Sequence, residues 1–315
     1  MVGFGRPPHL LGLRTQTASA HLVPLFMSSS NAPIPHLCAV AASRERRLLQ
    51  QPSVWLHEEL AVQMAARLKV LRSAPKHWLD WAPEWGGQRS AAAVGAVFPA
   101  ARRWVHHPDR SASAPSAPWW RLGTSSSQWD GQRAVGMVWA NMGLRSVLHP
   151  ALIFGQWHQA LEPGGLLMFS ALGPHSLQAL REVYAACGWG EAATPFVDMH
   201  DWGDQLLQAG YADPVMDTSF LDLTYSSAEA MLQDLRAMGR NTHDRRFAAC
   251  RTPRWRQQLL EAIESDMPRD AQGRLVLSLE VIWGHAWRGL LAQAEPTTTI
   301  SARDMRDMLR RNIRK

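Results

Sequence analysis

The segment that most constrains the fold is residues 166–171, which are almost all apolar and directly follow the turn Pro163-Gly164-Gly165. Strands that read as nearly continuous apolar runs are buried on both faces, as the strands of parallel sheets are. Residues 177–187 then carry apolar side chains at helical spacing, and Gly188 supplies a helix stop. These segments predict a parallel β-sheet that is covered by helices.

The same alternation of strand and helix extends over much of the chain. Before residue 166, strands are predicted at residues 77–81, 102–107 and 134–140, and helices at residues 89–98 and 150–161. This order is typical of a doubly wound α/β sheet. Further along, residues 215–225 and 275–282 are extended segments, and we expect them to pair antiparallel at one edge of the sheet.

Composition narrows the class of protein and of partner. At 315 residues and 46% hydrophobic residues, the chain can bury the core of a large domain. Its net charge of +6 favours a nucleic acid, an anionic membrane surface or an acidic protein as partner, or else a solvated arginine-rich surface. Basic and aromatic residues are not interleaved as in nucleic-acid modules. No apolar run reaches the ~18 residues of a membrane helix.

The cysteines bear on metal binding and on compartment. Cys38, Cys187 and Cys250 are far apart and form no CxxC pair, which argues against a thiolate zinc site and against a disulfide framework. The reducing cytoplasm is the compartment that fits this usage.

Three regions of the chain differ in composition. Residues 1–44 contain no acidic residue and are rich in Ser, Pro, Ala and His, so we expect a disordered basic extension. Residues 45–290 hold all the predicted strands and form the expected domain. Residues 291–315 begin with a Pro/Thr-rich stretch and end in a short predicted helix. Six basic and two acidic side chains in residues 303–315 indicate a solvated basic tail.

Several segments, in order along the chain, resemble those of one enzyme family. Residues 161–170 read L-E-P-G-G-L-L-M-F-S, similar to the L-x-P-G-G-x-L-x-x-S segment of class I S-adenosylmethionine (SAM)-dependent methyltransferases. Residues 138–144, V-W-A-N-M-G-L, resemble the V-W-S-N-L-x-L strand end of the malonyl-acyl-carrier-protein O-methyltransferases of biotin synthesis. Residues 173–177, 196–201 and 280–287 resemble further segments of that family.

The resemblance covers about residues 44–287 and implies both a fold and a reaction. The fold is a Rossmann-like, doubly wound, mostly parallel seven-stranded sheet with an antiparallel C-terminal strand pair. The reaction is the SAM-dependent methylation of the free carboxylate of a malonyl thioester on acyl carrier protein. That partner is acidic, which suits a basic enzyme, and neither a nucleic acid nor a membrane is implied. Since the carboxylate is already ionised near neutral pH, we expect positioning residues rather than a strong general base.

The resemblance places the cofactor at the loop after residues 79–81, where the family pattern is L-D-x-G-x-G-x-G. Here Ala82 and Glu84 replace the first two glycines, and Gly86 keeps the third. Glycines suit such a loop because the turn is tight and the backbone approaches the cofactor closely. Glu84 adds a carboxylate near the place of SAM's own carboxylate, and Pro83 has no N–H to donate.

The cofactor-binding residues that the resemblance implies are Asp80, Gly86, Gly87, Asp109 and Asn141. Asp109 would be the acid for the ribose, expected roughly 20 residues beyond the loop. Asn141 follows a predicted strand, at the end where open α/β sheets bind ligands. The alternatives are that Asp80 organises the loop and that Asn141 caps the end of the strand.

Three residues in family-like segments are candidates for the substrate pocket: His200, His285 and Trp287. A histidine can donate a hydrogen bond to a malonyl carboxylate or thioester. The alternatives are half-buried histidines with other partners and a core tryptophan. His106 and His107 are adjacent, but no carboxylate or cysteine spacing completes a metal site, so we expect no metal.

Two functional hypotheses follow from the altered loop. In the first, the loop rearranges, SAM binds, and the chain is a methyltransferase. In the second, SAM binding is weak or lost, and the chain is a non-catalytic binding partner on the same scaffold. A nucleic-acid methyltransferase is disfavoured, because the N-P-P-Y-type tetrapeptide of base amino methylation is replaced by Asn141-Met142-Gly143-Leu144.

Overall fold

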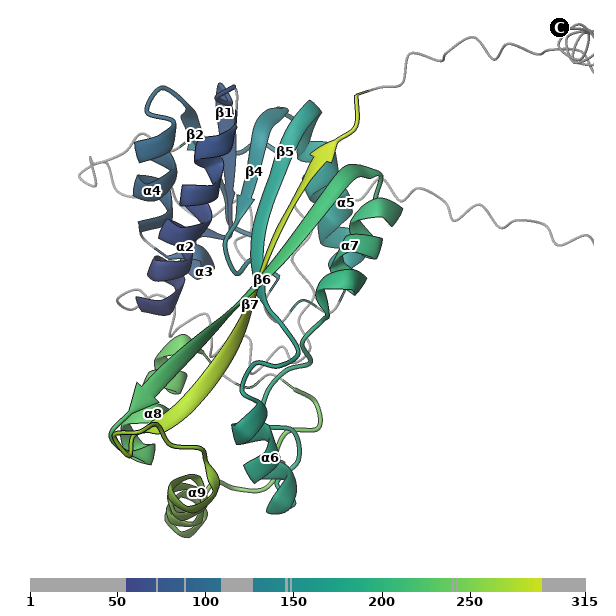
Figure 1. Cartoon of the computed structure of the whole chain (residues 1–315). Helices are drawn as coiled ribbons and strands as arrows, with labels where there is room; N and C mark the ends of the chain where they lie inside the picture. The colour runs from purple at the N-terminus through teal and green to yellow at the C-terminus, as the bar shows by residue number, and fades with distance from the viewer. Residues whose placement is uncertain are drawn as a thin grey trace, which may run out of the picture.

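The computed structural model describes residues 55–290, except positions 72, 88, 109–126, 145, 146, 148, 240 and 242. The predicted extension (residues 1–44), the predicted tail (residues 291–315) and Asp109 lie outside the described residues. A seven-stranded sheet with strand order β3-β2-β1-β4-β5-β7-β6 forms the centre of the molecule (Figure 1). This confirms the predicted mostly parallel, doubly wound α/β fold.

Five strands run parallel to one another. They are β1 (His77–Trp81), β2 (Arg102–His106), β3 (Ser127–Gln128), β4 (Val135–Ala140) and β5 (Leu161–Leu172). Because β1 lies between β2 and β4, the direction of winding reverses beside it. Open α/β sheets bind ligands beyond the carboxyl ends of the strands at such a switch point. The ends of β1, β2 and β4 are therefore where a ligand is expected.

The last two strands, β6 (Tyr211–Tyr225) and β7 (Leu275–Arg288), are antiparallel to each other, and β7 also pairs antiparallel with β5. This confirms the predicted C-terminal strand pair. β7 runs beyond its predicted end at residue 282, because residues 283–287 continue the pairing with β5 as far as Trp287 opposite Leu166. The predicted turn Pro163-Gly164-Gly165 lies within β5, and Gly164 has a φ of +78°.

Helices cover both faces of the sheet (Figure 1). On one face lie α2 (Trp55–Arg67), which continues into the short helix η1 (Leu68–Val70), and α4 (Arg89–Val97). On the other lie α5 (Pro150–Ala160) and α7 (Met199–Gln208). The two core clusters follow this division: Trp78 and Trp139 pack with the α2 face, whereas Trp81 and Trp157 pack with the α5 face.

A separate group of helices lies beyond the carboxyl ends of the parallel strands, beside the far part of the β6–β7 pair (Figure 1). It consists of α6 (Gln178–Ala186), α8 (Ala228–Met238) and α9 (Pro253–Asp266). Ser227 caps α8, since its side chain accepts a hydrogen bond from the Ala230 N–H, and Glu229 in the first turn pairs with Arg256.

Candidate active site

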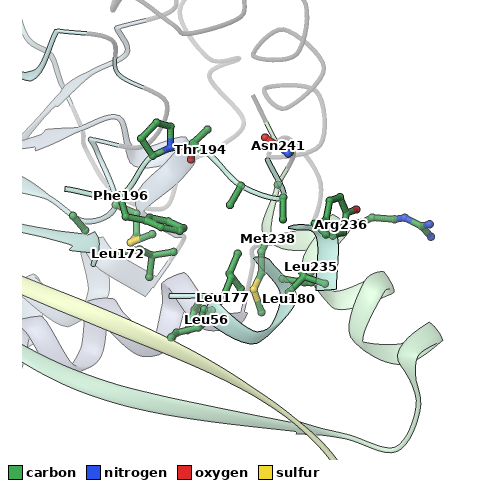
Figure 2. Close-up of a pocket in the computed structure, with 18 of the residues that line it drawn as sticks. Leu56, Leu172, Leu177, Leu180, Thr194, Phe196, Leu235, Arg236, Met238 and Asn241 are labelled. Atoms are coloured by element: carbon green, nitrogen blue, oxygen red, sulfur yellow. The ribbon is translucent and has the colours of Figure 1, made fainter. Parts of the chain in front are cut away.

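A cavity of about 360 Å³ lies beyond the carboxyl ends of β4 and β5. Its walls come from α2, the segment after β4, the end of β5, α6, residues 192–197, α8 and α9. Figure 2 shows the side chains of Leu172, Phe196 and Met238 directed toward this cavity. A concave, mostly apolar site with a few polar groups is the usual form of a small-molecule pocket. Apolar walls of this kind exclude water and suit an acyl group.

Three arginines from α8, α9 and the segment before α9 belong to the lining of this cavity: Arg236, Arg251 and Arg256. Arg251 lies over the ring of Trp255, with its guanidinium carbon 5.4 Å from the ring centroid. Arg256 pairs with Glu229, so its charge is partly balanced. The apolar cavity is therefore bordered by positive charge.

Asn141 joins the cavity side of the sheet to the loop after β1. Its side chain is fully buried, and its Nδ2 donates to the carbonyls of Gly86 at 2.6 Å and His57 at 2.8 Å. The Ser170 hydroxyl donates to Asn141 Oδ1 at 2.7 Å. The amide thereby fixes α2 and the loop against the ends of β4 and β5. These contacts describe a structural role for Asn141 at the end of β4, as in the strand-cap alternative, and its role toward the cofactor stays a prediction.

The loop after β1 keeps a tight turn without its first two glycines. Ala82 adopts a φ of 54° and a ψ of 55°, the left-handed region that glycine adopts more readily. The Ala82 N–H donates to the His106 carbonyl at 2.9 Å. The next residues form a single helical turn, α3 (Pro83–Gly86), where the sequence predicts an irregular loop. Pro83 is tolerated there because the first turn of a helix leaves its N–H groups unpaired.

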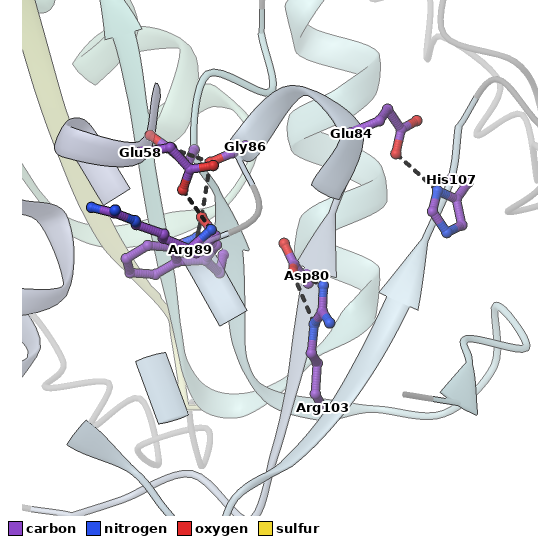
Figure 3. Close-up of polar contacts among 10 residues, drawn as sticks. Glu58, Asp80, Glu84, Gly86, Arg89, Arg103 and His107 are labelled. Carbon is purple, nitrogen blue, oxygen red and sulfur yellow. Dashed lines mark hydrogen bonds and ion pairs between the residues drawn. The ribbon is translucent and has the colours of Figure 1, made fainter. Parts of the chain in front are cut away.

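The carboxylate of Asp80 is satisfied within the sheet. It is 1% exposed and accepts hydrogen bonds from Nη2 of Arg103 at 2.5 Å and from Nε at 2.9 Å (Figure 3). Burial raises the pKa of Asp80, and the adjacent Arg103 guanidinium opposes that shift. Arg103 comes from β2, the strand next to β1. Asp80 thus ties the two strands together rather than pointing an unpaired carboxylate at the loop.

Glu84 and His107 form a second contact across the ends of β1 and β2. Glu84 Oε2 lies 2.8 Å from Nδ1 of His107, and both side chains are about one-fifth exposed (Figure 3). Glu84 stands at the second glycine position of the loop. His107 directly follows β2, two residues before Asp109, the predicted acid for the ribose. The pair therefore joins a glycine position of the loop to the segment that carries that predicted acid.

A third carboxylate reaches the same loop from α2. Oε2 of Glu58 accepts a hydrogen bond from the Arg89 N–H at 2.5 Å, at the first residue of α4 (Figure 3). Gly87, with a φ of +87°, leaves room for it, because a Cβ on Gly87 would lie 3.1 Å from the Glu58 carboxyl carbon. No sequence motif indicated this contact, which joins residues 31 positions apart.

An aromatic cluster, also missed by sequence reasoning, covers the ends of β1 and β2. The rings of Trp81 and His106 are tilted, with centroids 4.2 Å apart, and Trp129 meets His106 edge-on at 5.6 Å. All three are buried, and neither ring nitrogen of His106 has a hydrogen-bond partner among the described residues. Burial, followed by the charge of His107, lowers the pKa of His106 to about 4.

The predicted residues fall into two groups. Gly86 and Asn141 are joined by a hydrogen bond and Gly87 directly follows Gly86, whereas Asp80, in β1, pairs with Arg103. Their role toward the cofactor stays a prediction. His200, His285 and Trp287 do not line the cavity.

Those three residues lie elsewhere in the fold. His200 is exposed in the first turn of α7, where its N–H donates to Asp198. His285 lies in β7 opposite Met168, and burial lowers its pKa. Trp287, also in β7, is half-buried against the core. Among the described residues, no group of three or more His, Cys, Asp or Glu is placed to hold a metal ion.

The contacts of the loop bear on whether SAM can bind in the way that the resemblance implies. That mode needs an open glycine loop for the amino-acid part and an acid after β2 for the ribose. The turn and Gly87 are retained, but Glu58 fills the space beside Gly87. Asp109, the predicted acid for the ribose, lies outside the described residues. The described loop therefore does not fit the amino-acid part of SAM in this arrangement, and the Glu58 contact would have to open to admit it.

Curated relatives decide the family. A malonyl-[acyl-carrier protein] O-methyltransferase of Gallionella capsiferriformans is 32% identical over 250 residues, covering 75% of this chain and 85% of that protein. The chain belongs to this family. Relatives of the same name from Laribacter hongkongensis (38% identity) and Methylovorus sp. (36%) match over 49% of this chain and 52% of their own length. The chain thus spans about half the length of these two relatives. No protein-family profile matches the chain.

Solved structures that align with this chain include a putative methyltransferase from Bacillus halodurans, at 13% identity and a TM-score of 0.47. The alignment covers 72% of this chain and 98% of that one. Phosphoethanolamine N-methyltransferase 2 from Haemonchus contortus aligns at 14% identity and a TM-score of 0.41 to 0.40 in two structures, each covering 72% of this chain and 52% of that chain. In the part of the chain that the structure describes, no helix is long and apolar enough to cross a membrane.

Proposed function

We propose that the chain is a SAM-dependent O-methyltransferase that methylates the free carboxylate of a malonyl thioester on acyl carrier protein. The observation that carries this proposal is the relationship, over 250 residues, to a protein of that name. Biotin biosynthesis in the cytoplasm is the setting that we propose for it. The free, exposed thiols of Cys187 and Cys250 are compatible with a reducing compartment.

The cavity supports the acceptor half of this proposal. Met142 is part of its lining. This residue directly follows Asn141, whose side chain joins α2 and the loop to the strand ends at the switch point of the sheet. A malonyl carboxylate is ionised near neutral pH, so no general base is needed to create the nucleophile. The part left to the protein is to hold the thioester and limit the access of water, and the apolar wall of the cavity supports that role.

The border of the cavity supports the proposed partner. Arg236, Arg251 and Arg256 belong to the lining of the cavity, and their positive charge supports delivery of the thioester by an acidic carrier protein. Complementary charge speeds encounter and fixes orientation more than it adds affinity. An acidic carrier protein suits this border, and we propose neither a nucleic acid nor a membrane as partner.

A second candidate is a non-catalytic protein that binds the acyl carrier partner without SAM. The contacts of Glu58 with α4 and of Glu84 with His107 favour it, because they occupy the loop where the family pattern places the cofactor. Glu58, Glu84 and His107 do not line the cavity, so the acyl site is present in the non-catalytic protein as well.

Calorimetric titration of the full chain with SAM and with S-adenosylhomocysteine separates the two candidates. The enzyme predicts saturable binding of both compounds. A chain that binds malonyl-acyl carrier protein but neither adenosyl compound at millimolar concentration is the non-catalytic protein. Rescue of a biotin-requiring strain that lacks its methyltransferase then tests the acceptor. Failure of well-expressed, SAM-binding protein to rescue would point to a different acceptor.

A further inference from the structure

The first turn of α4 holds a carboxylate that belongs to the chain itself. Helix N-termini leave backbone N–H groups unpaired and carry the positive end of the helix dipole, so they bind anions. Here the anion is Glu58, whose Oε2 lies 2.5 Å from the Arg89 nitrogen. Glu58 is only 7% exposed, so water screens this contact weakly.

The loop is shaped to receive this carboxylate. Gly87 precedes α4 with a φ of +87°, a conformation that side-chain-bearing residues rarely adopt. A Cβ on Gly87 would meet the Glu58 carboxyl carbon at 3.1 Å and its Oε2 at 3.2 Å. We call the space formed by Gly87 and the Arg89 N–H the α4 cradle. A glycine followed by a helix N-terminus is a common arrangement for binding the anionic group of a ligand.

The position of Glu58 is fixed from two sides. The carbonyl of His57, the preceding residue, accepts a hydrogen bond from buried Asn141 at 2.8 Å. Leu56 and Leu60, on the same helix, are both 1% exposed in the core. Glu58 therefore cannot leave the α4 cradle by rotating α2 as a whole without breaking these contacts.

We propose that the α4 cradle is a carboxylate-binding site, that Glu58 occupies it intramolecularly, and that Glu58 thereby competes with the carboxylate of an amino-acid-bearing ligand. The ligand class follows from the cradle, which offers the Arg89 N–H and a positive helix end to one carboxylate. For SAM as that ligand, this inference rests on the proposed function. Glu58 then sets the affinity for the amino-acid part of SAM without contacting the acceptor.

The first test measures the cradle without any nucleoside. Glu58→Ala empties the α4 cradle, and we expect a lower thermal midpoint that sodium formate restores in a saturable way, against a sodium chloride control of equal ionic strength. The matched control is Glu59→Ala, because Glu59 is exposed on the same helix and accepts from Gln63. Formate should leave the Glu59 variant and the unaltered chain unchanged. Equal responses of the two variants to formate would overturn the carboxylate site.

The second test measures competition. Glu58→Gln keeps an acceptor for the Arg89 N–H but removes the charge. We expect it to tighten binding of SAM and S-adenosylhomocysteine at least about tenfold in calorimetry, while the affinity for 5′-methylthioadenosine, which lacks the carboxylate, stays unchanged. Glu59→Gln should match the unaltered chain. An equal gain for all three compounds, or a gain for none of the compounds that bind, would overturn the competition.

The two tests keep this inference distinct from the proposed function. If no variant binds any adenosyl compound, the proposed SAM dependence fails, and with it the competition with SAM. The formate result then decides separately whether Glu58 occupies a carboxylate site. If the unaltered chain binds SAM tightly and Glu58→Gln does not change that affinity, the proposed function stands and the competition is wrong.

Discussion

Oε2 of Glu84 lies 2.8 Å from Nδ1 of His107, so a residue at a glycine position of the loop holds the residue that follows β2. In the family pattern, one of these positions has no side chain and the other region supplies an acid. We infer that this contact stands where the family pattern implies a contact with the cofactor. Because Glu84 and His107 contact each other, a double substitution tests their effect on SAM binding more fully than a substitution of either residue alone.

The first prediction concerns this pair. Glu84→Gly with His107→Asp removes the contact and places an acid directly after β2, so the double variant should bind SAM about tenfold more tightly, or ~1.4 kcal/mol. Glu84→Gly alone should give a smaller gain. Calorimetry measures both. As a control, Glu229→Gln breaks an exposed pair far along the chain with Arg256 and should leave the affinity unchanged. An unaltered affinity in the double variant would show that another part of the loop excludes SAM.

The second prediction concerns pH. Burial lowers the pKa of His106 to about 4, whereas the unfolded chain takes up this proton near 6.5. Protons therefore favour the unfolded state between these values, so the stability contributed by neutral His106 is full above pH 6.5 and lost as the pH falls toward 4. The loss is on the order of 3 kcal/mol for such a shift.

Urea unfolding of the unaltered chain and of His106→Phe, measured across this pH range, checks that loss. The variant should show a flatter decline in unfolding free energy, with the residual slope expected from His158 and His285, whose pKa values are also lowered by burial. Parallel curves for the two proteins would mean that His106 is not protonated in the unfolding transition.

The third prediction concerns Asp80 and Arg103. Replacing Arg103 by Met leaves a carboxylate that is 1% exposed without its guanidinium, which should destabilise the fold by ~3 kcal/mol. Arg245→Gln removes an exposed pair with Glu191 and should cost less than ~1 kcal/mol. Urea unfolding measures both destabilisations from the shift of the midpoint, provided that the dependence of the unfolding free energy on urea keeps its slope. A cost for Arg103→Met as small as that of the exposed pair would contradict the buried role of Asp80.

The fourth prediction concerns the cavity. Thr194→Trp places an indole at the cavity wall, and we expect binding of a malonyl-pantetheine thioester to weaken at least about tenfold. The same substitution at exposed Thr224, in β6, leaves the cavity open and serves as the control. Thermal midpoints show whether both variants fold. Undiminished binding by folded Thr194→Trp would place the acyl site elsewhere.

The fold was predictable because it depends on patterns within short segments. The apolar run at residues 166–171 indicated a strand buried on both faces, and it pairs with β4 on one side and β7 on the other. The exact bounds were less predictable. β7 extends to Arg288 because its partner β5 continues beside it, and a partner strand is not visible in the segment itself.

The candidate site was predictable only where one motif held it together. Gly86 and Asn141 meet through a hydrogen bond, since one stands in the loop and the other at the end of a strand, whereas Asp80 pairs with Arg103. Glu58 was missed because its partner is 31 residues away and is a backbone N–H, which no residue type marks. The apolar lining on α6 and α8 was missed because leucines at helical spacing look like core whether they face a sheet or a cavity.

His200, His285 and Trp287 show the limit of carrying a motif over as a site. All three stand in segments that resemble the family, yet none lines the cavity. His285 and Trp287 lie in the strand that joins β5 to β6, where a family-like sequence is explained by pairing on both sides. Their role toward a substrate stays a prediction.

Consecutive residues of α2 face different parts of the molecule: Leu56 and His57 line the cavity, and Glu58 fills the α4 cradle. A helix turn moves as one unit, so a shift that an acyl ligand imposes on Leu56 or His57 is also imposed on Glu58. Linkage then requires reciprocity: if acyl binding changes the affinity of the cradle for a carboxylate by some factor, a carboxylate in the cradle changes the affinity for the acyl group by the same factor. The affinity of the cavity for an acyl ligand therefore depends on whether the α4 cradle is occupied, and each affinity has to be measured with the other site both empty and filled.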